Sequence, residues 1–162
     1  MKILAFIQHE NGNINPVSLE ALKGAQDIAK NVNGSIKVVT FGPSISDKLI
    51  KYNISEIIQI DNTELNNYNS LYYVKAMEEI IKQEIPTIII YGHTYEARDW
   101  VPRLSARLDI PFISDCINFN YTDTLSYTRS VYQGKMNIDI IPNTDKYIIS
   151  FQSGAFKTDN LD

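Results

Sequence analysis

Two histidines, His9 and His93, are the residues best suited to acid–base or metal chemistry, and each lies just after an apolar run typical of a buried parallel strand. The carboxyl ends of parallel strands meet at one edge of a sheet, so both could converge there with Glu10 and Asp115. Two imidazoles and a carboxylate can bind a metal ion or move a proton. The spacing is not that of a ligand motif, so we favour polar residues placed where strands emerge into water.

The single cysteine, Cys116, also has two interpretations. A nucleophilic thiolate needs a neighbouring base and an electropositive setting. A lone cysteine beside an apolar strand is more commonly a small core residue, and we favour that interpretation. One cysteine excludes an internal disulfide framework and a zinc site built from cysteines.

The segment from Gly92 to Leu108 combines basic and acidic residues in helical spacing. Arg103 and Arg107 are four residues apart and share one helix face. These arginines either form a solvated face or reach across the sheet or to a partner subunit. Pro102 costs about 3 kcal/mol inside a helix, unless the helix begins late enough to place it in the first turn.

Phosphate-binding and polyanion-binding signals are missing from the sequence. No G-x-G-x-x-G or G-x-x-x-x-G-K-[ST] motif is present, which excludes a dinucleotide fingerprint and a P-loop. The net charge is −4 and the chain has no Lys/Arg cluster, so nucleic acid and anionic membranes are not expected partners. No apolar run approaches the roughly 18 residues that a membrane span needs, and the first run is too short for a signal peptide.

Apolar runs alternate with helical patterns through the first 115 residues, and β-branched isoleucine clearly outnumbers leucine. Such alternation predicts a three-layer α/β/α fold with a mostly parallel, Rossmann-like sheet, followed after residue 115 by extra short strands. The expected strands cover 3–7, 36–41, 56–60, 87–91 and 111–114, then 118–121, 126–132, 136–141 and 147–151; the expected helices cover 16–32, 44–52, 72–83 and 96–108.

Several short motifs occur in one order along nearly the whole chain. They are Asn11-Gly12, Asn15-Pro16 and Leu19 to Leu22; Thr94, Arg98-Asp99, Pro102-Arg103, Ala106, Leu108 and Ile113-Ser114-Asp115; then Arg129 to Lys135 and Gly154-Ala155-Phe156. Together they resemble the N-terminal domain of the alpha subunit of electron transfer flavoproteins. The sequence departs from that pattern at Ser130, where proline is usual, and at Gln152-Ser153, where an arginine is common.

The resemblance implies a fold like that of the adenine nucleotide alpha hydrolases, with residues 1–156 as the domain and 157–162 as a tail or linker that has no core to join. It implies a scaffold and subunit-interface domain in a complex that carries electrons from dehydrogenases to an acceptor. FAD is expected between a beta-type subunit and the alpha C-terminal domain, whose binding elements are absent before Asp162. That domain belongs to the same or a separate chain, AMP is possible in the beta-type partner, and no catalytic residue is expected here.

The same resemblance suggests which residues contact the partner. They are Arg98, Arg103, Arg129 and Tyr132, and replacing Arg103 or Arg129 with alanine should weaken assembly more than folding. Tyr127 and Tyr132 should then lie on an exposed surface.

Two alternative functions remain open from the sequence. A stand-alone adenine-nucleotide-binding protein of the universal-stress type would have a similar fold, although its phosphate loop is not found after residues 87–91. A small enzyme using His9, His93 and Asp115 is the other alternative. The expected location is the cytoplasm, or the mitochondrial matrix in a eukaryote.

Overall fold

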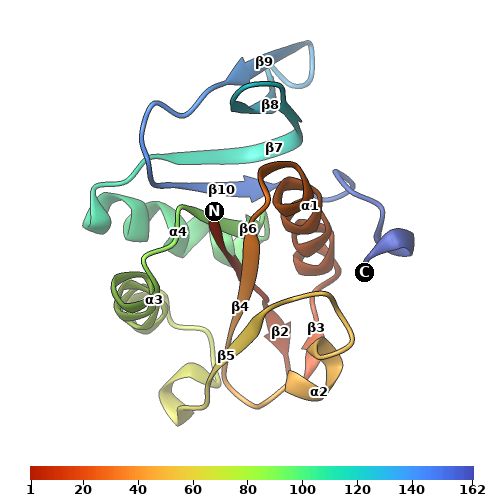
Figure 1. Ribbon diagram of the computed structural model, residues 1–162. Coiled ribbons are helices and arrows are strands. Elements are labelled where there is room, and N and C mark those ends of the chain that lie inside the picture. The colour runs from red at the N-terminus through yellow and green to blue at the C-terminus, as the bar shows by residue number, and fades with distance from the viewer.

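Eight strands form one sheet in the computed structural model, which describes residues 1–162 (Figure 1). They are β1 (Lys2–Phe6), β4 (Ser35–Phe41), β5 (Glu56–Ile60), β6 (Ile88–Gly92), β7 (Phe112–Tyr121), β8 (Leu125–Val131), β9 (Met136–Ile140) and β10 (Tyr147–Phe151). Their order is β5-β4-β1-β6-β10-β7-β8-β9. Every neighbouring pair from β5 to β7 is parallel, whereas β7 with β8 and β8 with β9 are antiparallel.

Helices cover both faces of the parallel part of this sheet, which confirms the predicted three-layer α/β/α fold (Figure 1). On one face lies α1 (Pro16–Val32), and on the other lie α3 (Ser70–Glu84) and α4 (Tyr95–Leu108). Shorter elements complete the chain: a hairpin of β2 (His9–Glu10) and β3 (Asn13–Ile14), α2 (Ser46–Leu49), and the 3₁₀ turns η1 (Thr63–Leu65) and η2 (Thr158–Asn160). None of these helices has the length and apolar character needed to span a membrane.

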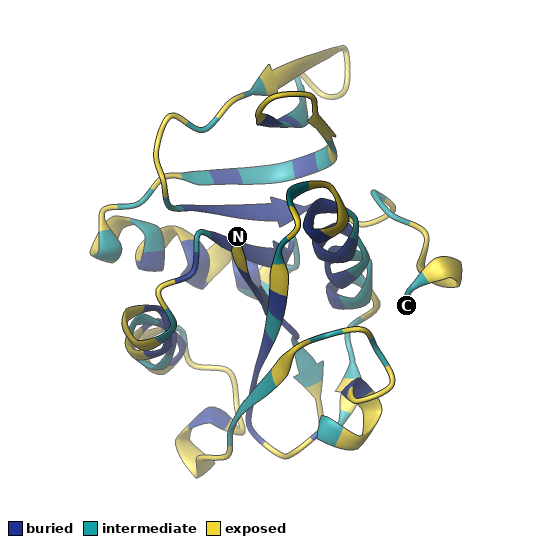
Figure 2. Cartoon of the chain, viewed as in Figure 1, coloured by how far each residue is buried: buried dark blue, intermediate teal, exposed yellow.

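Alternating side chains of the central strands fill two separate cores. Ile88 and Ile90 of β6 join the core beneath α1, while Ile89 and Tyr91 join the core beneath α3 and α4. Strands covered on both faces read as continuous apolar runs, which is why these strands were predictable. Both β6 and β10 are buried along their lengths. Figure 2 shows the contrast between the buried β10 and the largely exposed β9 at the edge of the sheet.

The structure corrects several predicted element boundaries. The expected strands 111–114 and 118–121 are one strand, β7, which pairs first with β10 and then with β8. Asp115, with φ of 62°, lies at the irregularity in the pairing of β7 with β10, between Ile113 and Cys116. The helix expected over 44–52 is only the single turn of α2. Pro102 lies inside α4, in agreement with the helix expected over 96–108, and not in a first turn.

Residues 157–162 are attached to the domain, so the expectation that they have no core to join is wrong. Leu161 packs against the core beneath α1. The backbone N–H of Asp162 donates to Oε1 of Gln26 at 3.1 Å, and the Asp162 carboxylate lies 2.5 Å from Nζ of Lys30. The extreme end of the chain therefore rests against α1.

Tyr127 corrects another expectation, because its side chain is completely buried rather than on a partner surface. It lies on the inner face of β8, and its hydroxyl oxygen is 2.9 Å from that of Tyr147 in β10. Tyr132 does match the expectation and is 75% exposed. The inner face of β8 therefore extends the core, while the turn after β8 reaches into solvent.

We predict that Tyr127→Phe lowers the free energy of unfolding by about 1–3 kcal/mol, because it leaves the buried Tyr147 hydroxyl without its partner. Replacing both tyrosines with phenylalanine should recover part of that loss, since neither hydroxyl then remains unpaired. Urea unfolding would measure this, with Tyr132→Phe as the exposed control expected to change stability by less than about 0.5 kcal/mol. Equal effects of Tyr127→Phe and the control would contradict the pairing.

Candidate functional site

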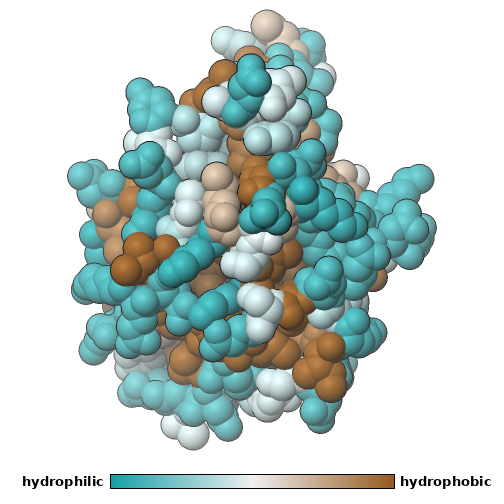
Figure 3. Space-filling model, viewed as in Figure 1, coloured by the Kyte–Doolittle hydropathy of each residue, from teal (hydrophilic) through white to brown (hydrophobic).

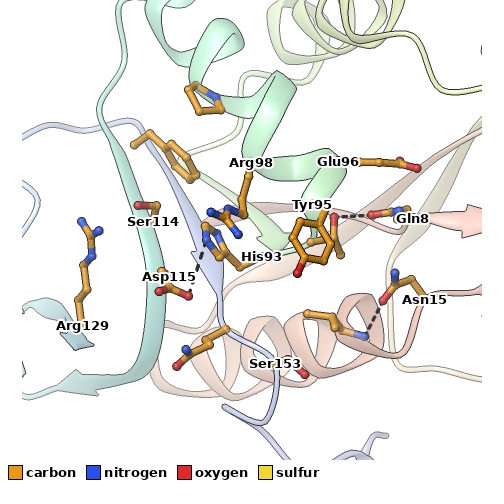
Figure 4. A pocket seen from close by; sticks show the side chains of 15 residues that line it. Gln8, Asn15, His93, Tyr95, Glu96, Arg98, Ser114, Asp115, Arg129 and Ser153 are labelled. Carbon is orange, nitrogen blue, oxygen red and sulfur yellow. Dashed lines mark hydrogen bonds and ion pairs between the residues drawn. The ribbon is translucent and has the colours of Figure 1, made fainter. Parts of the chain in front are cut away.

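A cavity of about 840 Å³ opens at the carboxyl ends of β1, β6, β10 and β7 (Figure 4). The chain runs outward from β1 to β5 and then crosses to β6 on the other side of β1, so the strand order reverses there. Ligands of open α/β sheets bind at such reversal points. Only three of its fifteen lining residues are hydrophobic, so most of the side chains around the cavity can form hydrogen bonds or carry charge.

A chain of hydrogen bonds fixes the floor of the cavity. Thr94 caps α4, because its Oγ1 accepts from the Ala97 N–H at 3.1 Å. The Thr94 hydroxyl donates to Oε1 of Gln8 at 2.6 Å, and the Gln8 N–H donates to Oγ of Ser18 at 3.0 Å. These bonds connect the end of β1 with the first turns of α4 and α1.

Close contact between α1 and β6 requires the glycine at position 92. A Cβ atom there would lie 2.8 Å from the carbonyl oxygen of Val17, closer than real Cβ contacts. Asn15 begins α1 by accepting the Val17 N–H at 3.0 Å, and Pro16 occupies the first helical position. The start of α1 therefore lies directly against the strand that carries His93.

His93 lies between β10 and β7. Its Nδ1 is 2.8 Å from Oγ of Ser150, which also accepts the backbone N–H of Asp115 at 3.1 Å. Its Nε2 is 3.7 Å from Oδ1 of Asp115. Burial lowers the pKa of His93, the Asp115 carboxylate opposes that effect, and Arg98 and Arg129 lower the pKa further. A neutral imidazole that accepts the Ser150 proton at Nδ1 carries its own N–H at Nε2, on the side of Asp115.

This Ser–His–Asp set is not arranged for nucleophilic catalysis. Ser150 is completely buried, and its oxygen is occupied by the Asp115 N–H and by His93. A catalytic serine must instead present its oxygen to a substrate, with only the base beside it. The three residues therefore fasten β6, β10 and β7 together at the cavity wall.

The four residues predicted to contact a partner divide into two pairs. Arg98 and Arg129 line the cavity, where Arg98 lies 5.6 Å from the ring centre of Tyr95. Arg103 lies outside it, with Nη2 3.2 Å from Oδ1 of Asp99. Tyr132 borders an adjoining hollow of about 580 Å³, which shares Arg129 with the main cavity.

His9 does not join His93, so the convergence of both histidines with Glu10 and Asp115, which the sequence left open, does not occur. His9 lies in the β2–β3 hairpin and does not line the cavity. The structure contains no group of three or more His, Cys, Asp or Glu residues placed to hold a metal ion. Burial lowers the pKa of His9 as well.

Cys116 is a core residue, as we favoured from the sequence. Its side chain is completely buried, and burial raises the pKa of its thiol to about 12. Ser150 was missed, although a lone serine inside an apolar strand was a visible signal. Gln152 and Ser153, where the sequence departs from the motif pattern, also line the cavity.

These features define a doubly wound α/β domain with a polar cavity at its strand-order reversal and an antiparallel extension at one sheet edge. A family model described as the electron transfer flavoprotein domain matches residues 3–162. The chain belongs to the electron transfer flavoprotein domain family. This membership confirms the fold and the resemblance predicted from the motifs.

Individual relatives agree with this assignment. The chain is 30% identical to the electron transfer flavoprotein subunit alpha of Bacillus subtilis, over 92% of its own length and 46% of the relative's. It is also 30% identical to the alpha subunit of Thermoanaerobacterium thermosaccharolyticum, over 96% of its own length and 49% of the relative's. A mitochondrial alpha subunit of Schizosaccharomyces pombe, named as probable, is 24% identical over 95% and 45%. The chain thus spans about half the length of the curated relatives it matches, and the universal-stress alternative finds no support among them.

We predict that stability falls as the pH drops from about 7.5 to about 5.5, because half-buried His93 has a lowered pKa and takes up its proton at a lower pH than it does in the unfolded chain. The unfolded state then binds more protons, so acidification favours it. His93→Gln should reduce this loss, and His9→Gln should reduce it independently. Urea unfolding at both pH values would measure the change, and an unaltered pH slope in both variants would contradict it.

Proposed function

We propose that this chain is the N-terminal, subunit-interface domain of an electron transfer flavoprotein alpha subunit, in a complex that carries electrons from dehydrogenases to an acceptor. The match to alpha subunits over nearly the whole chain supports this proposal. The complex would lie in the cytoplasm, or in the mitochondrial matrix of a eukaryote. The name of the Schizosaccharomyces pombe relative agrees with a mitochondrial location in a eukaryote.

FAD would be bound outside this domain. Only three of the fifteen residues that line the cavity are hydrophobic, so it offers few apolar side chains to enclose the dimethylbenzene part of a flavin ring. The remaining binding groups would come from a beta-type subunit and from an alpha C-terminal domain, in the same or a separate chain. AMP would belong to the beta-type partner. We assign no catalytic residue to this chain.

The β8–β9 hairpin is the observation that carries the interface proposal. Its exposed apolar side chains are Tyr132, Met136, Ile138 and, just beyond β9, Ile141. β9 is the outermost strand of the sheet, so one side of its backbone has no neighbouring strand. Figure 3 shows hydrophobic patches among hydrophilic side chains in the upper part of the molecule, where this hairpin lies. An apolar, open sheet edge is typical of a surface that another chain covers.

Arg103 and Tyr132 remain in the proposed interface because both side chains are open to solvent. The Arg103 ion pair with Asp99 is exposed and contributes little to folding. Arg103→Ala is therefore expected to leave the domain folded, which makes its effect on assembly measurable. Arg98 and Arg129 line the cavity instead.

The test of the proposed function is to purify the tagged chain from its own host and record the absorbance spectrum and native mass of what accompanies it. A yellow complex with flavin bands and a beta-type subunit is the expected result. A colourless chain without a partner would contradict the proposal.

We predict that Ile138→Asp and Tyr132→Asp each weaken association with the beta-type subunit by about tenfold or more, because a charge would be placed in a desolvated apolar contact. Leu71→Asp is the matched control, since Leu71 is an exposed leucine at the start of α3 and outside the hairpin. Analytical ultracentrifugation of the mixed subunits would measure the affinity. Equal weakening by all three variants would show that the hairpin is not the contact.

A further inference from the structure

Two arginines in the cavity have no negative partner within the chain. Neither Arg98 nor Arg129 forms an ion pair, although six of the other lysines and arginines do so at 3.2 Å or less, namely Lys23, Lys30, Lys37, Lys82, Arg103 and Arg107. Nε of Arg129 is buried and has no hydrogen-bond partner. A buried cationic donor without a partner is energetically costly. This feature indicates a group that is supplied from outside the chain.

The fold brings these arginines to the same place from different elements. Arg98 extends from α4, and Arg129 comes from β8, where it pairs with Cys116 at the irregular point of β7 (Figure 4). Both lie close enough to His93 to lower its pKa, so the imidazole lies within the field of both. The two arginines therefore line the same cavity from different elements, with Asp115 between them (Figure 4).

The carboxylates of the cavity do not neutralise this pair. Asp115 lies beside His93 and makes no ion pair with either arginine. Glu96 projects from the same helix as Arg98 but lies beside Gln8, at the other end of the labelled cluster (Figure 4). The region between Arg98 and Arg129 therefore keeps an excess of positive charge.

We propose that the cavity binds a small, hydrophilic, phosphate-bearing molecule, with Arg98 and Arg129 as its anion-binding residues. Guanidinium groups present paired N–H donors that match phosphate oxygens, and two of them suit a doubly charged anion. The volume of about 840 Å³ is that of a typical small-molecule site.

The rest of the lining defines the remainder of the ligand. Ser114, Gln152 and Ser153 border the cavity beside the arginines and offer hydroxyl and amide groups. Such groups bind hydroxyls and other polar substituents, whereas a long acyl chain would meet only three hydrophobic residues in the lining. The ligand is therefore a phosphorylated polar compound rather than a lipid. This binding does not require the subunit partner proposed above.

The test is isothermal titration of the 162-residue chain with inorganic pyrophosphate as the probe, at low ionic strength. We expect saturable binding at one site, weakened about tenfold or more by Arg98→Ala and by Arg129→Ala, because each removes a charged hydrogen-bonding group. Arg103→Ala is the matched control. It removes an arginine from the same helix, outside the cavity, and should leave the affinity unchanged.

Further measurements separate a site from general charge attraction. Pyrophosphate should raise the melting temperature of the chain, whereas sodium chloride at the same ionic strength should not. Circular dichroism would establish that each variant is folded. If Arg129→Ala unfolds, Arg98→Ala still tests the site, because Arg98 is exposed and its removal does not disturb the core. Absence of saturable pyrophosphate binding, unchanged affinity in Arg98→Ala, or an equal loss in Arg103→Ala would overturn the proposal.

Discussion

The insertion of β10 between β6 and β7 is the constraint on which both surfaces of this domain depend. All five residues of β10 are buried, and the strand pairs in parallel with a neighbour on each side. A strand in that position can be reached only after the chain has completed β7, so residues between β7 and β10 must leave the parallel sheet and return. The β8–β9 hairpin is that excursion, and it carries Arg129 and Tyr132.

The same insertion assembles the wall of the cavity. Ser150 of β10 accepts from the N–H of Asp115 and contacts His93, which connects three strands through one buried hydroxyl. The N–H of His93 donates to the carbonyl of Phe151 at 2.8 Å, and the N–H of Gln152 donates to that of Cys116 at 2.9 Å. The backbone itself thus continues the pairing to the edge where the cavity opens.

Local pattern was sufficient to predict most elements but not which strands are neighbours. Ile88 to Tyr91 and Tyr147 to Phe151 were predictable as strands because continuous apolar runs signal burial on both faces. Nothing in either run specifies that they pair with each other, since that depends on contacts almost 60 residues apart. Tyr127 shows the same limit: its pattern indicated an aromatic strand residue, but its burial depends on Tyr147.

The candidate site was predictable to a similar degree. Polar residues that follow parallel strands meet at one edge of the sheet, and this rule was enough to predict that His93 and Asp115 lie close together. It failed for His9, because the two residues after β1 already turn into the β2–β3 hairpin. The rule also gave no indication that the side chain of Arg129 lines the same cavity, because Arg129 lies on an antiparallel strand outside the α/β repeat. That placement follows from the irregularity at Asp115 and from the pairing of Arg129 with Cys116.

Arg129 connects two surfaces of opposite chemistry. Its side chain lines the polar cavity, whereas three residues later Tyr132 borders the adjoining hollow and the apolar hairpin. A ligand bound through Arg129 and a partner bound through Tyr132 would therefore act on the same segment of β8 and its turn. Any change that the ligand causes in the partner's affinity must be matched by an equal change that the partner causes in the ligand's affinity. The position of this single strand makes the edge of the sheet a place where ligand binding and subunit association can be coupled.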